Sequence, residues 1–430
     1  MKHVQTVPLK EVGNIPSAEI KPGIPAFGEK SFQYRRGEED LFSVKFKEPV
    51  LIEVASQPEK WGFFQFPLIY RGQDKNTLIS KWSMAPDNIK SYGKGGHGFA
   101  ISRDGGKNWT KTDYEPLGGG LLLPSGDRIS IHTPSALNIS KLKMPPVIHT
   151  AKENYGRTLA YYPVKDLPEE LRGVYLKRLK KGESDWVIEK SVLEDPAAVR
   201  YADADLFPVV WWGDMHMAAD GSIIAGIYPD FNLNKEGKVA PSGVGFYRST
   251  DEGLTWRLQG RIPYVPELEK DPLGNKRLAL GFTEPGFEIL ADGTFICVMR
   301  TTDGLGTTPM YISRSSDMGK TWTPAKVFTN SGVLPRLLNL ENGVTVLASG
   351  RPGVQIRFST DSKAENWSDP FEMLPFSNEK DPVSCGYTEL LATGPDTFLV
   401  IYSDFKHEIA DKELRKAIKV REIKVSPKKK

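Results

Sequence analysis

The densest group of chemically useful side chains is the run Trp211-Trp212-Gly213-Asp214-Met215-His216. Side chains of a strand alternate between its two faces, so we expect Trp212, Asp214 and His216 to share one face. An aromatic platform, a carboxylate and an imidazole on one surface suit sugar binding and proton transfer. The alternative interpretation is that His216 is a hydrogen-bonded core residue.

Four further polar residues fall at the ends of expected β-hairpins. Glu284 opens one hairpin and Arg300 closes it, and the separation of 300 − 284 = 16 residues suits two ends that return to one edge. Arg351 closes the next hairpin and Tyr387 opens the last one. The alternative is that a Glu before a proline is an exposed turn residue and that the Tyr belongs to the core. Polar groups that converge on one edge predict a binding pocket there.

A repeated turn sets the positions of these hairpins along the chain. The pattern SxDxGxxW occurs at Ser102–Trp109, Ser249–Trp256 and Ser315–Trp322, and a degraded copy keeps Ser359, Asp361 and Trp367. Each copy follows a short apolar run. We expect the Asp carboxylate to accept backbone N–H bonds, the Gly to take a positive φ, and the Trp to cover the adjoining strands. The turns therefore indicate the architecture and carry no catalysis.

Six strand-turn-strand units lie between and around these turns. They span 63–82, 118–133, 211–228, 282–300, 334–351 and 385–404, and several contain the hairpin dipeptides Asp-Gly or Asn-Gly. Helical periodicity is almost absent. Six hairpins, each followed by more strand, predict an all-β fold, a six-bladed β-propeller of four-stranded antiparallel blades.

The expected organisation is one propeller domain over 31–425. Residues 1–30 are predicted to form an extended arm, 134–205 to elaborate the second blade, and 426–430 to form a basic tail. The alternating strand Ala417–Val425 is predicted to close the ring by pairing near Phe32–Tyr34, because open sheet edges are a liability. Cys297 and Cys385 lie in different repeats, and we expect both to be free thiols.

With the repeated turns and the hairpins placed, the chain resembles the sialidase (neuraminidase) superfamily of propellers with Asp-box, or BNR, repeats, over about residues 50–425. The resemblance implies that Tyr387 attacks the anomeric carbon, that Glu284 takes its proton, and that Arg300 and Arg351 hold a substrate carboxylate. A phenol needs such a base because its ordinary pKa is near 10. The implied activity is that of an exo-acting, retaining glycoside hydrolase on a terminal, acidic or unusual sugar.

The chain departs from the family pattern at two places. Members carry a first arginine in an Arg-Ile-Pro motif, and the matching stretch here is Gln65-Phe66-Pro67. Gln65 donates hydrogen bonds but brings no charge, and Arg71 is an uncertain substitute six residues on. The acid/base aspartate that the family implies is assigned to Asp87, in a loop.

Composition excludes some partners. The 430 residues carry 57 basic and 54 acidic side chains, so a net charge of +3 gives no field that suggests nucleic acid as a partner. No apolar stretch approaches a membrane span, and His97 and His132 fall in no zinc or calcium spacing. We therefore expect a glycan substrate, no metal or other cofactor, no membrane insertion and a monomer. The location is predicted to be secreted or periplasmic if a signal peptide has been trimmed, and cytoplasmic otherwise.

Two other functions remain open at the level of sequence. One is a hydrolase or polysaccharide lyase that uses His216 and Asp214 on the same scaffold. The other is a propeller that binds glycans without catalysis, because many propellers only bind. These functions are discriminated by whether one pocket brings together five side chains, namely Gln65, Glu284, Arg300, Arg351 and Tyr387.

Overall fold

The computed structural model describes residues 23–57, 59–74, 76–153, 155–302, 308–351, 353–375 and 381–428. The predicted all-β class is confirmed, since helical structure in these ranges is limited to six three-residue 3-10 turns. They are η1 (Ile89–Ser91), η2 (Ile139–Lys141), η3 (Val164–Asp166), η4 (Glu169–Leu171), η5 (Gly274–Lys276) and η6 (Ala410–Lys412). None of the described helices has the length and apolar character needed to cross a membrane.

Two of the sheets are plain four-stranded antiparallel units in which each strand pairs with the next. One consists of β5 (Phe63–Arg71), β6 (Leu78–Met84), β7 (His97–Ser102) and β8 (Thr110–Thr112). The other consists of β22 (Phe282–Ile289), β23 (Phe295–Thr301), β24 (Met310–Ser315) and β25 (Lys326–Thr329). Each contains one of the predicted hairpins and one SxDxGxxW turn.

Two further sheets combine late strands with strands from the beginning of the chain. The first runs β26 (Val333–Asn339), β27 (Thr345–Gly350), β28 (Val354–Ser359) and β29 (Phe371–Leu374), with β1 (Ile24–Pro25) parallel to β29. The second runs β30 (Thr388–Ala392), β31 (Thr397–Glu408) and β32 (Leu414–Pro427), and β32 pairs with β3 (Glu39–Phe46) and β4 (Val50–Val54).

The predicted partner of the last strand was wrong by one strand. Phe32–Tyr34 lies in β2 (Lys30–Arg36), which pairs with β3 and not with β32. The sequence indicated that an early strand covers the edge of the last strand. Three early strands have suitable alternation, and only the path of the chain in space selects among them. Residues 1–22 of the expected arm, and Lys429 and Lys430 of the expected tail, lie outside the described residues.

The remaining strands form one sheet of 13 strands. Two four-stranded runs within it are β9 (Leu121–Leu122), β10 (Arg128–Ile131), β14 (Val174–Leu179) and β15 (Val187–Glu194), then β18 (Trp212–Met217), β19 (Ile223–Asn232), β20 (Gly243–Ser249) and β21 (Thr255–Ile262). The irregular stretch adds β11 (Leu137–Asn138), β12 (His149–Lys152), β13 (Thr158–Pro163), β16 (Ala198–Asp203) and β17 (Leu206–Phe207). These added strands join the sheet where β16 pairs with β19.

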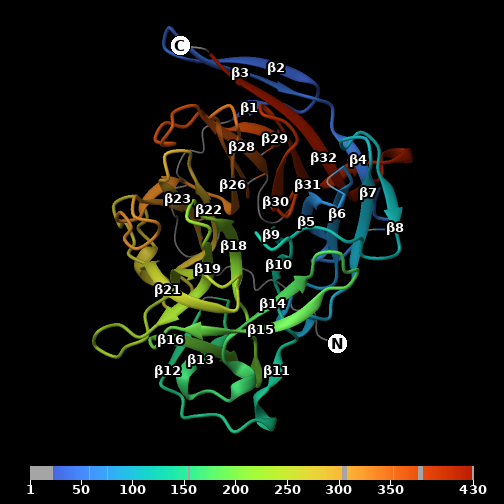
Figure 1. Cartoon of the computed structure of the whole chain (residues 1–430). Coiled ribbons are helices and arrows are strands. Elements are labelled where there is room, and N and C mark those ends of the chain that lie inside the picture. Colours follow the sequence, from blue (N-terminus) through green and yellow to red (C-terminus); the bar gives the residue numbers. More distant parts are fainter. Residues whose placement is uncertain are drawn as a thin grey trace.

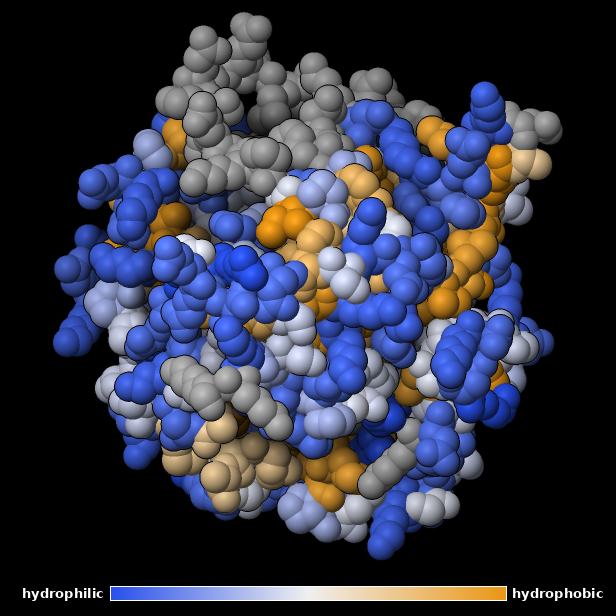
Figure 2. Space-filling view, turned by 90° about the horizontal axis from the view of Figure 1, so that it is seen from above, coloured by the Kyte–Doolittle hydropathy of each residue, from blue (hydrophilic) through white to orange (hydrophobic). Residues whose placement is uncertain are grey.

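All six predicted hairpins are antiparallel strand pairs. Figure 1 shows the sheets arranged around a common centre, with β5, β18, β22, β26 and β30 nearest to it, and the colour sequence passes once around the molecule. The face in Figure 2 is mostly hydrophilic, with apolar side chains in separate small groups. Cys297 and Cys385 are both buried and free, as expected.

The repeated turns have the predicted internal bonding. In the third copy the Ser315 hydroxyl donates to Asp317, and Asp317 Oδ1 accepts the N–H of Thr321 at 2.9 Å. Gly319 has φ +81°, and Trp322 Nε1 donates to its carbonyl at 3.0 Å. The degraded copy keeps this arrangement with Ala364 at φ 49° in place of the glycine. These bonds are satisfied within the turns, which supports a purely structural role.

Three of the central strands share a local distortion at one end. Phe66, Glu284 and Leu334 have φ values of 52°, 46° and 38°, and a proline follows each of them. The strand pairing shifts register at the same points. A non-glycine residue at positive φ costs about 1–3 kcal/mol and is found most often at functional sites. The distortions therefore mark the end of the strands at which a site is expected.

Candidate active site

Tyr387, Glu284 and Arg300 come together at this end of the molecule, with Glu284 on β22, Arg300 on β23 and Tyr387 directly before β30. The Tyr387 hydroxyl donates a short hydrogen bond to Glu284 Oε1. Arg300 Nη1 donates to the same carboxylate oxygen at 2.7 Å and to the Tyr387 hydroxyl at 3.2 Å. The second oxygen, Glu284 Oε2, accepts the backbone N–H of Leu334 at 3.0 Å. The distorted backbone at Glu284 and Leu334 thus holds the carboxylate in a fixed orientation.

Arg351 lies over the ring of Tyr387. Its guanidinium carbon is 5.6 Å from the centre of the Tyr387 ring, and its Nε donates to Cys385 O at 2.9 Å. Close backbone packing of Gly350 against Gly386 brings the chain to this position. A Cβ placed on Gly350 would lie 2.1 Å from Gly386 Cα, so only glycine permits the approach. Phe66 completes the surroundings, with its ring centre 4.8 Å from that of Tyr387.

The electrostatics leave Glu284 ionised and Tyr387 neutral near pH 7. Burial disfavours the Glu284 carboxylate, but the charge of Arg300 and the Tyr387 hydroxyl outweigh it, so its pKa lies below the ordinary 4.5. Burial, followed by the Glu284 charge, raises the pKa of Tyr387 well above 10, against the opposing pull of Arg300 and Arg351. A neutral phenol bonded to an ionised carboxylate is a nucleophile with its base in place. We call Tyr387, Glu284, Arg300 and Arg351 the site layer.

A second charged group lies on neighbouring central strands, and one of its members, Glu389, follows Tyr387 by two residues. Arg336 on β26 donates to Asp214 on β18 at 2.6 Å and is 3.3 Å from Glu389 on β30. Burial is the first cause of a raised pKa at Glu389, opposed by Arg336. We call Asp214, Arg336 and Glu389 the ion layer. The guanidinium of Arg336 is the one cation of the ion layer, and two carboxylates share it. It is therefore not free to bind an anionic ligand.

The predicted face of Trp212, Asp214 and His216 is divided among different neighbours. Trp212 packs against Tyr92 and Tyr228, with ring centres 5.2 and 5.6 Å away. Asp214 belongs to the ion layer. His216 Nδ1 is 3.4 Å from Glu288 Oε1, and its ring is 4.5 Å from that of Phe287. The three side chains therefore do not form one reactive group.

Asp87, Gln65 and Arg71 differ in their relation to the site layer. Asp87 is exposed and accepts the indole N–H of Trp61 at 3.1 Å, and Trp61 in turn contacts Arg351. Gln65 is fully buried, and both atoms of its amide lack a hydrogen-bond partner among the described residues. Arg71 lies at the other end of β5, where Nη2 donates to Ala392 O at 2.6 Å. The structure thus brings Asp87 near the site and places Arg71 away from it.

Several residues at the centre were not predicted from the sequence. Arg336 and Glu389 follow Leu334 and Tyr387 by two positions, so strand alternation would have indicated both. Trp61 precedes β5 in a loop and gave no periodic signal. Tyr155 comes from the added strands and lies 2.9 Å, oxygen to oxygen, from Thr302, which accepts a bond from Arg300. No motif pointed to that contact.

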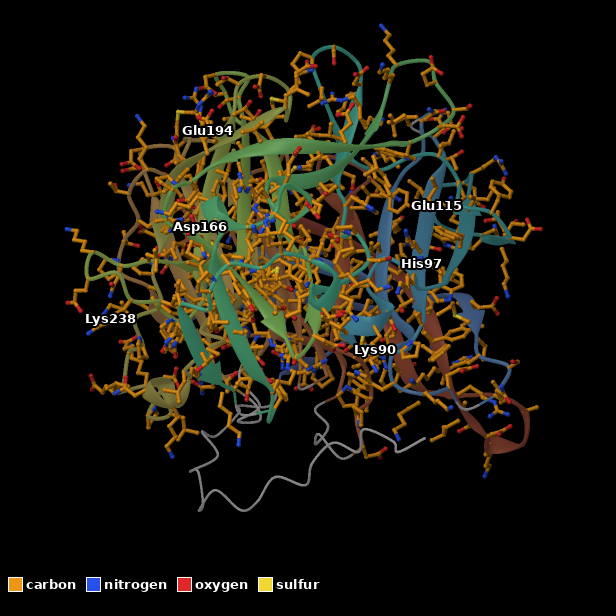
Figure 3. The ribbon with its side chains drawn as sticks, turned by 90° about the horizontal axis from the view of Figure 1, so that it is seen from below. Lys90, His97, Glu115, Asp166, Glu194 and Lys238 are labelled. Carbon is orange, nitrogen blue, oxygen red and sulfur yellow. The ribbon has the colours of Figure 1, made fainter. Side chains whose placement is uncertain are left out.

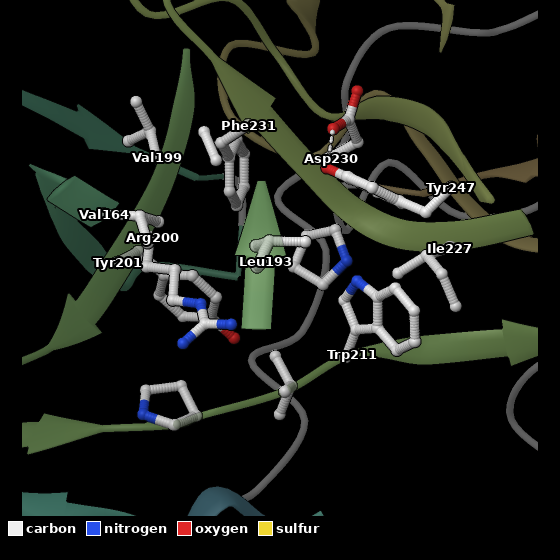
Figure 4. A pocket seen from close by; sticks show the side chains of 14 residues that line it. Val164, Leu193, Val199, Arg200, Tyr201, Trp211, Ile227, Asp230, Phe231 and Tyr247 are labelled. Carbon is white, nitrogen blue, oxygen red and sulfur yellow. Dashed lines mark hydrogen bonds between the residues drawn. The ribbon is translucent and has the colours of Figure 1, made fainter. Parts of the chain in front are cut away.

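Other polar clusters lie apart from the site layer. Figure 3 labels His97 and Glu115 together on the β5–β8 side of the molecule, and burial lowers the pKa of His97 to about 4. A small cavity beside the added strands is lined by Arg200, Asp230 and Tyr247 (Figure 4). Its acidic groups are already bonded, since Tyr247 and Arg261 both donate to Asp230. Among the described residues no group of three or more His, Cys, Asp or Glu could hold a metal ion.

Comparison with known proteins gives a likeness of fold. No family model and no curated protein matches the chain. The crystal structure of a protein of unknown function from Dyadobacter fermentans matches with a TM-score of 0.56 and 17% identity, over 89% of this chain and 99% of that one. This likeness supports a shared fold and carries no activity with it.

Weaker matches include glycoside hydrolases. Trypanosoma rangeli sialidase in complex with 2,3-difluorosialic acid matches with a TM-score of 0.42 and 14% identity, over 93% of this chain and 59% of that one. The present chain therefore spans less than two thirds of that sialidase chain. Penicillium chrysogenum alpha-L-arabinanase complexed with arabinobiose matches with a TM-score of 0.47 and 14% identity, over 86% and 98% of the two chains. At these scores the assignment of a function depends on the site itself.

Proposed function

We propose that this chain is a sialidase-like, exo-acting glycoside hydrolase built on a six-bladed β-propeller, and that it removes a terminal acidic sugar with retention of configuration. The observation that carries the proposal is the hydrogen-bonded set of Tyr387, Glu284 and Arg300. A partly buried phenol whose hydroxyl is bonded to an ionised carboxylate, beside two guanidinium groups, is an unusual arrangement for a purely structural core. It supplies a nucleophile, a base and a positive field in one place.

The first chemical step forms a bond between Tyr387 Oη and the anomeric carbon. Glu284 accepts the phenolic proton as the bond forms, and the bond from the anomeric carbon to the leaving oxygen breaks. Asp87 donates a proton to that oxygen. In the second step water attacks the same carbon and gives a proton to Asp87, while the tyrosyl bond breaks and Glu284 returns the proton to Tyr387. The two displacements together retain the configuration.

The charges of the site layer favour an anionic substrate. Within the described part of the chain, the Arg351 side chain forms a hydrogen bond only through Nε, and the charge of its guanidinium also acts on Glu284. Two parallel N–H groups match a carboxylate in a bidentate arrangement. A neutral phenol also approaches an anionic sugar without the repulsion that a carboxylate nucleophile would meet. Gln65 would bind substrate by hydrogen bonds alone, since it brings no charge.

The lyase and hydrolase alternative based on His216 and Asp214 gains no support from this geometry. Asp214 is held by Arg336, and His216 faces Glu288 and Phe287. Among the described residues, neither Asp214 nor His216 forms a hydrogen bond or ion pair with a residue of the site layer. The binding-only alternative is addressed by the experiment on turnover.

The proposal is tested with a panel of glycosides that includes sialosides, uronides and neutral sugars, each with a 4-nitrophenol leaving group. We expect wild-type turnover of at least one acidic glycoside, and a loss of about 10⁴-fold or more in kcat for Tyr387→Phe. Circular dichroism checks that the variant is folded. Equal rates of the two proteins would remove Tyr387 as the nucleophile, and binding of acidic glycans without any turnover would identify a binding protein.

A further inference from the structure

Trp61 is a half-exposed indole that its surroundings hold in one position. Its side chain is 43% exposed, although it contacts Asp87, Arg351 and Phe405. The Arg351 guanidinium lies 5.4 Å from its ring centre, and the Phe405 ring meets it edge-on at 6.3 Å. The backbone on either side is also fixed, because Lys416 Nζ donates to Lys60 O at 2.7 Å and to Phe63 O at 3.2 Å.

An aromatic side chain fixed in this way has little ordering left to lose when a ligand binds. Trp61 does not belong to the buried core that lies under β5 and β6. Core packing therefore does not account for an indole at this exposed position. A rigid, exposed aromatic surface next to polar groups is typical of a binding platform, because apolar faces of ligands stack on it at a low entropic cost. The position of the platform then indicates which part of a ligand it meets.

Two contacts of Trp61 place it beside the leaving group of the proposed reaction. On one side Arg351 touches both Trp61 and Tyr387, so the indole lies next to the site layer. On the other side Trp61 Nε1 donates to Asp87 Oδ2 at 3.1 Å. Asp87 must reach the leaving oxygen to give it a proton, because a general acid acts within hydrogen-bond distance. The leaving group therefore extends over Trp61.

We propose that Trp61 binds the leaving group by stacking against its ring, and that the indole N–H positions the Asp87 carboxyl toward the leaving oxygen. This inference rests on the proposed function of the site. It assigns the substrate to glycosides in which a second sugar follows the cleaved bond, that is, to disaccharides or longer glycans. Trp61 acts on the reaction through Asp87, so in catalysis it is a positioning residue.

The test uses two variants and three substrates that share the terminal sugar accepted by the wild type. Trp61→Phe keeps a ring and removes the N–H, whereas Trp61→Ala removes both. The three leaving groups are a second sugar, methanol and 4-nitrophenol. The first two are poor leaving groups that need a proton from Asp87, and 4-nitrophenol needs little assistance. Methanol offers no ring for stacking.

For Trp61→Phe we expect kcat to fall by about 10²-fold with the sugar and methanol leaving groups, and by less than about threefold with 4-nitrophenol. For Trp61→Ala we expect a further rise of about tenfold in KM with the sugar leaving group and none with methanol. Trp109→Phe is the matched control, because among the described residues the Trp109 N–H bonds only the Gly106 carbonyl of its own turn. This control should match the wild type on all three substrates.

Different outcomes separate this inference from the proposed function. If the wild type cleaves the substrates and Trp61→Phe loses the same factor with all three, or none, the positioning role is overturned. If Trp61→Ala and Trp61→Phe have equal KM values with the sugar leaving group, the stacking role is overturned. A wild type that cleaves none of the three overturns the proposed function, and the inference falls with it.

Discussion

The site layer and the ion layer lie next to each other at the centre of the molecule, since Tyr387 of one and Glu389 of the other are two residues apart, and they use their charges in opposite ways. In the ion layer Arg336 is shared by Asp214 and Glu389, so cation and anions satisfy one another. In the site layer Glu284 bonds a neutral phenol as well as Arg300, and Arg351 faces ring surfaces. The comparison teaches that a buried ion cluster at the centre of this fold is no sign of catalysis by itself. What distinguishes the site layer is a neutral phenol, that of Tyr387, which lies between charged side chains.

Glu284→Gln tests the site layer with the largest expected effect. An amide cannot accept the phenolic proton, so we expect kcat to fall by about 10³-fold. Because the pKa of Glu284 lies below 4.5, the wild-type carboxylate is present above that value and is lost as the pH falls through its lowered pKa. The acidic limb of kcat/KM should therefore lie below pH 4.5 in the wild type and be missing in the variant. An acidic limb above pH 4.5 that survives in Glu284→Gln would assign the base to another residue.

Arg336→Met tests the ion layer, where the expected effect is on stability. The substitution leaves the partly buried carboxylates of Asp214 and Glu389 without their cation, which should lower the free energy of unfolding by about 1–3 kcal/mol. Urea denaturation measures this loss, and kcat/KM of the folded variant should stay within about threefold of the wild type. A control that also carries Asp214→Asn and Glu389→Gln should recover most of the stability. A large loss of activity with unchanged stability would place Arg336 in the site instead.

Arg351→Lys tests whether Arg351 of the site layer binds a substrate carboxylate. Lysine keeps the charge and loses the bidentate fork, so we expect KM for the acidic substrate to rise about tenfold at nearly constant kcat. Titration of the free acidic sugar by calorimetry should show the same change in affinity. A matching neutral sugar serves as the control, and an equal rise in its KM would mean that Arg351 supports the Tyr387 ring only.

Gln65→Met has the smallest expected effect and concerns the position of the missing arginine. Both amide atoms of Gln65 are buried without partners among the described residues, and replacing them by a thioether of similar size should stabilise the fold by about 1 kcal/mol. If Gln65 binds substrate, the gain in the denaturation midpoint comes with a severalfold rise in KM. A stabilised variant with an unchanged KM would show that substrate binding does not use Gln65.

Local patterns predicted much of the fold, because the bonds that define them lie within a few residues. The SxDxGxxW turns bond their Ser and Asp side chains within the turn, and hairpins with Asp-Gly or Asn-Gly turns depend on local backbone preferences. The pairing of β32 with β3 and β4 joins segments about 370 residues apart, and nothing local in the sequence encodes it. The same limit explains why β3, which lies between β32 and the strand that contains Phe32–Tyr34, was missed.

The site shows the same division between local and long-range information. Glu284 and Arg300 belong to one hairpin, so their proximity followed from the turn between them. Tyr387 came from its position at the start of the last hairpin. Trp61 acquires its neighbours from the distant residues Arg351, Phe405 and Lys416, so its sequence context gave no indication. Gln65 was identified as a departure, but its burial depends on packing that the sequence does not show.

The central claim is that Tyr387 forms a covalent bond to the sugar. A fluorinated analogue of the substrate with an activated leaving group slows the second step and allows the intermediate to accumulate. Mass spectrometry of the digested protein should then show one sugar adduct on the peptide that contains Tyr387, and no adduct in Tyr387→Phe. An adduct on Glu284 or Asp87, or turnover of the true substrate with inverted configuration, would contradict the account.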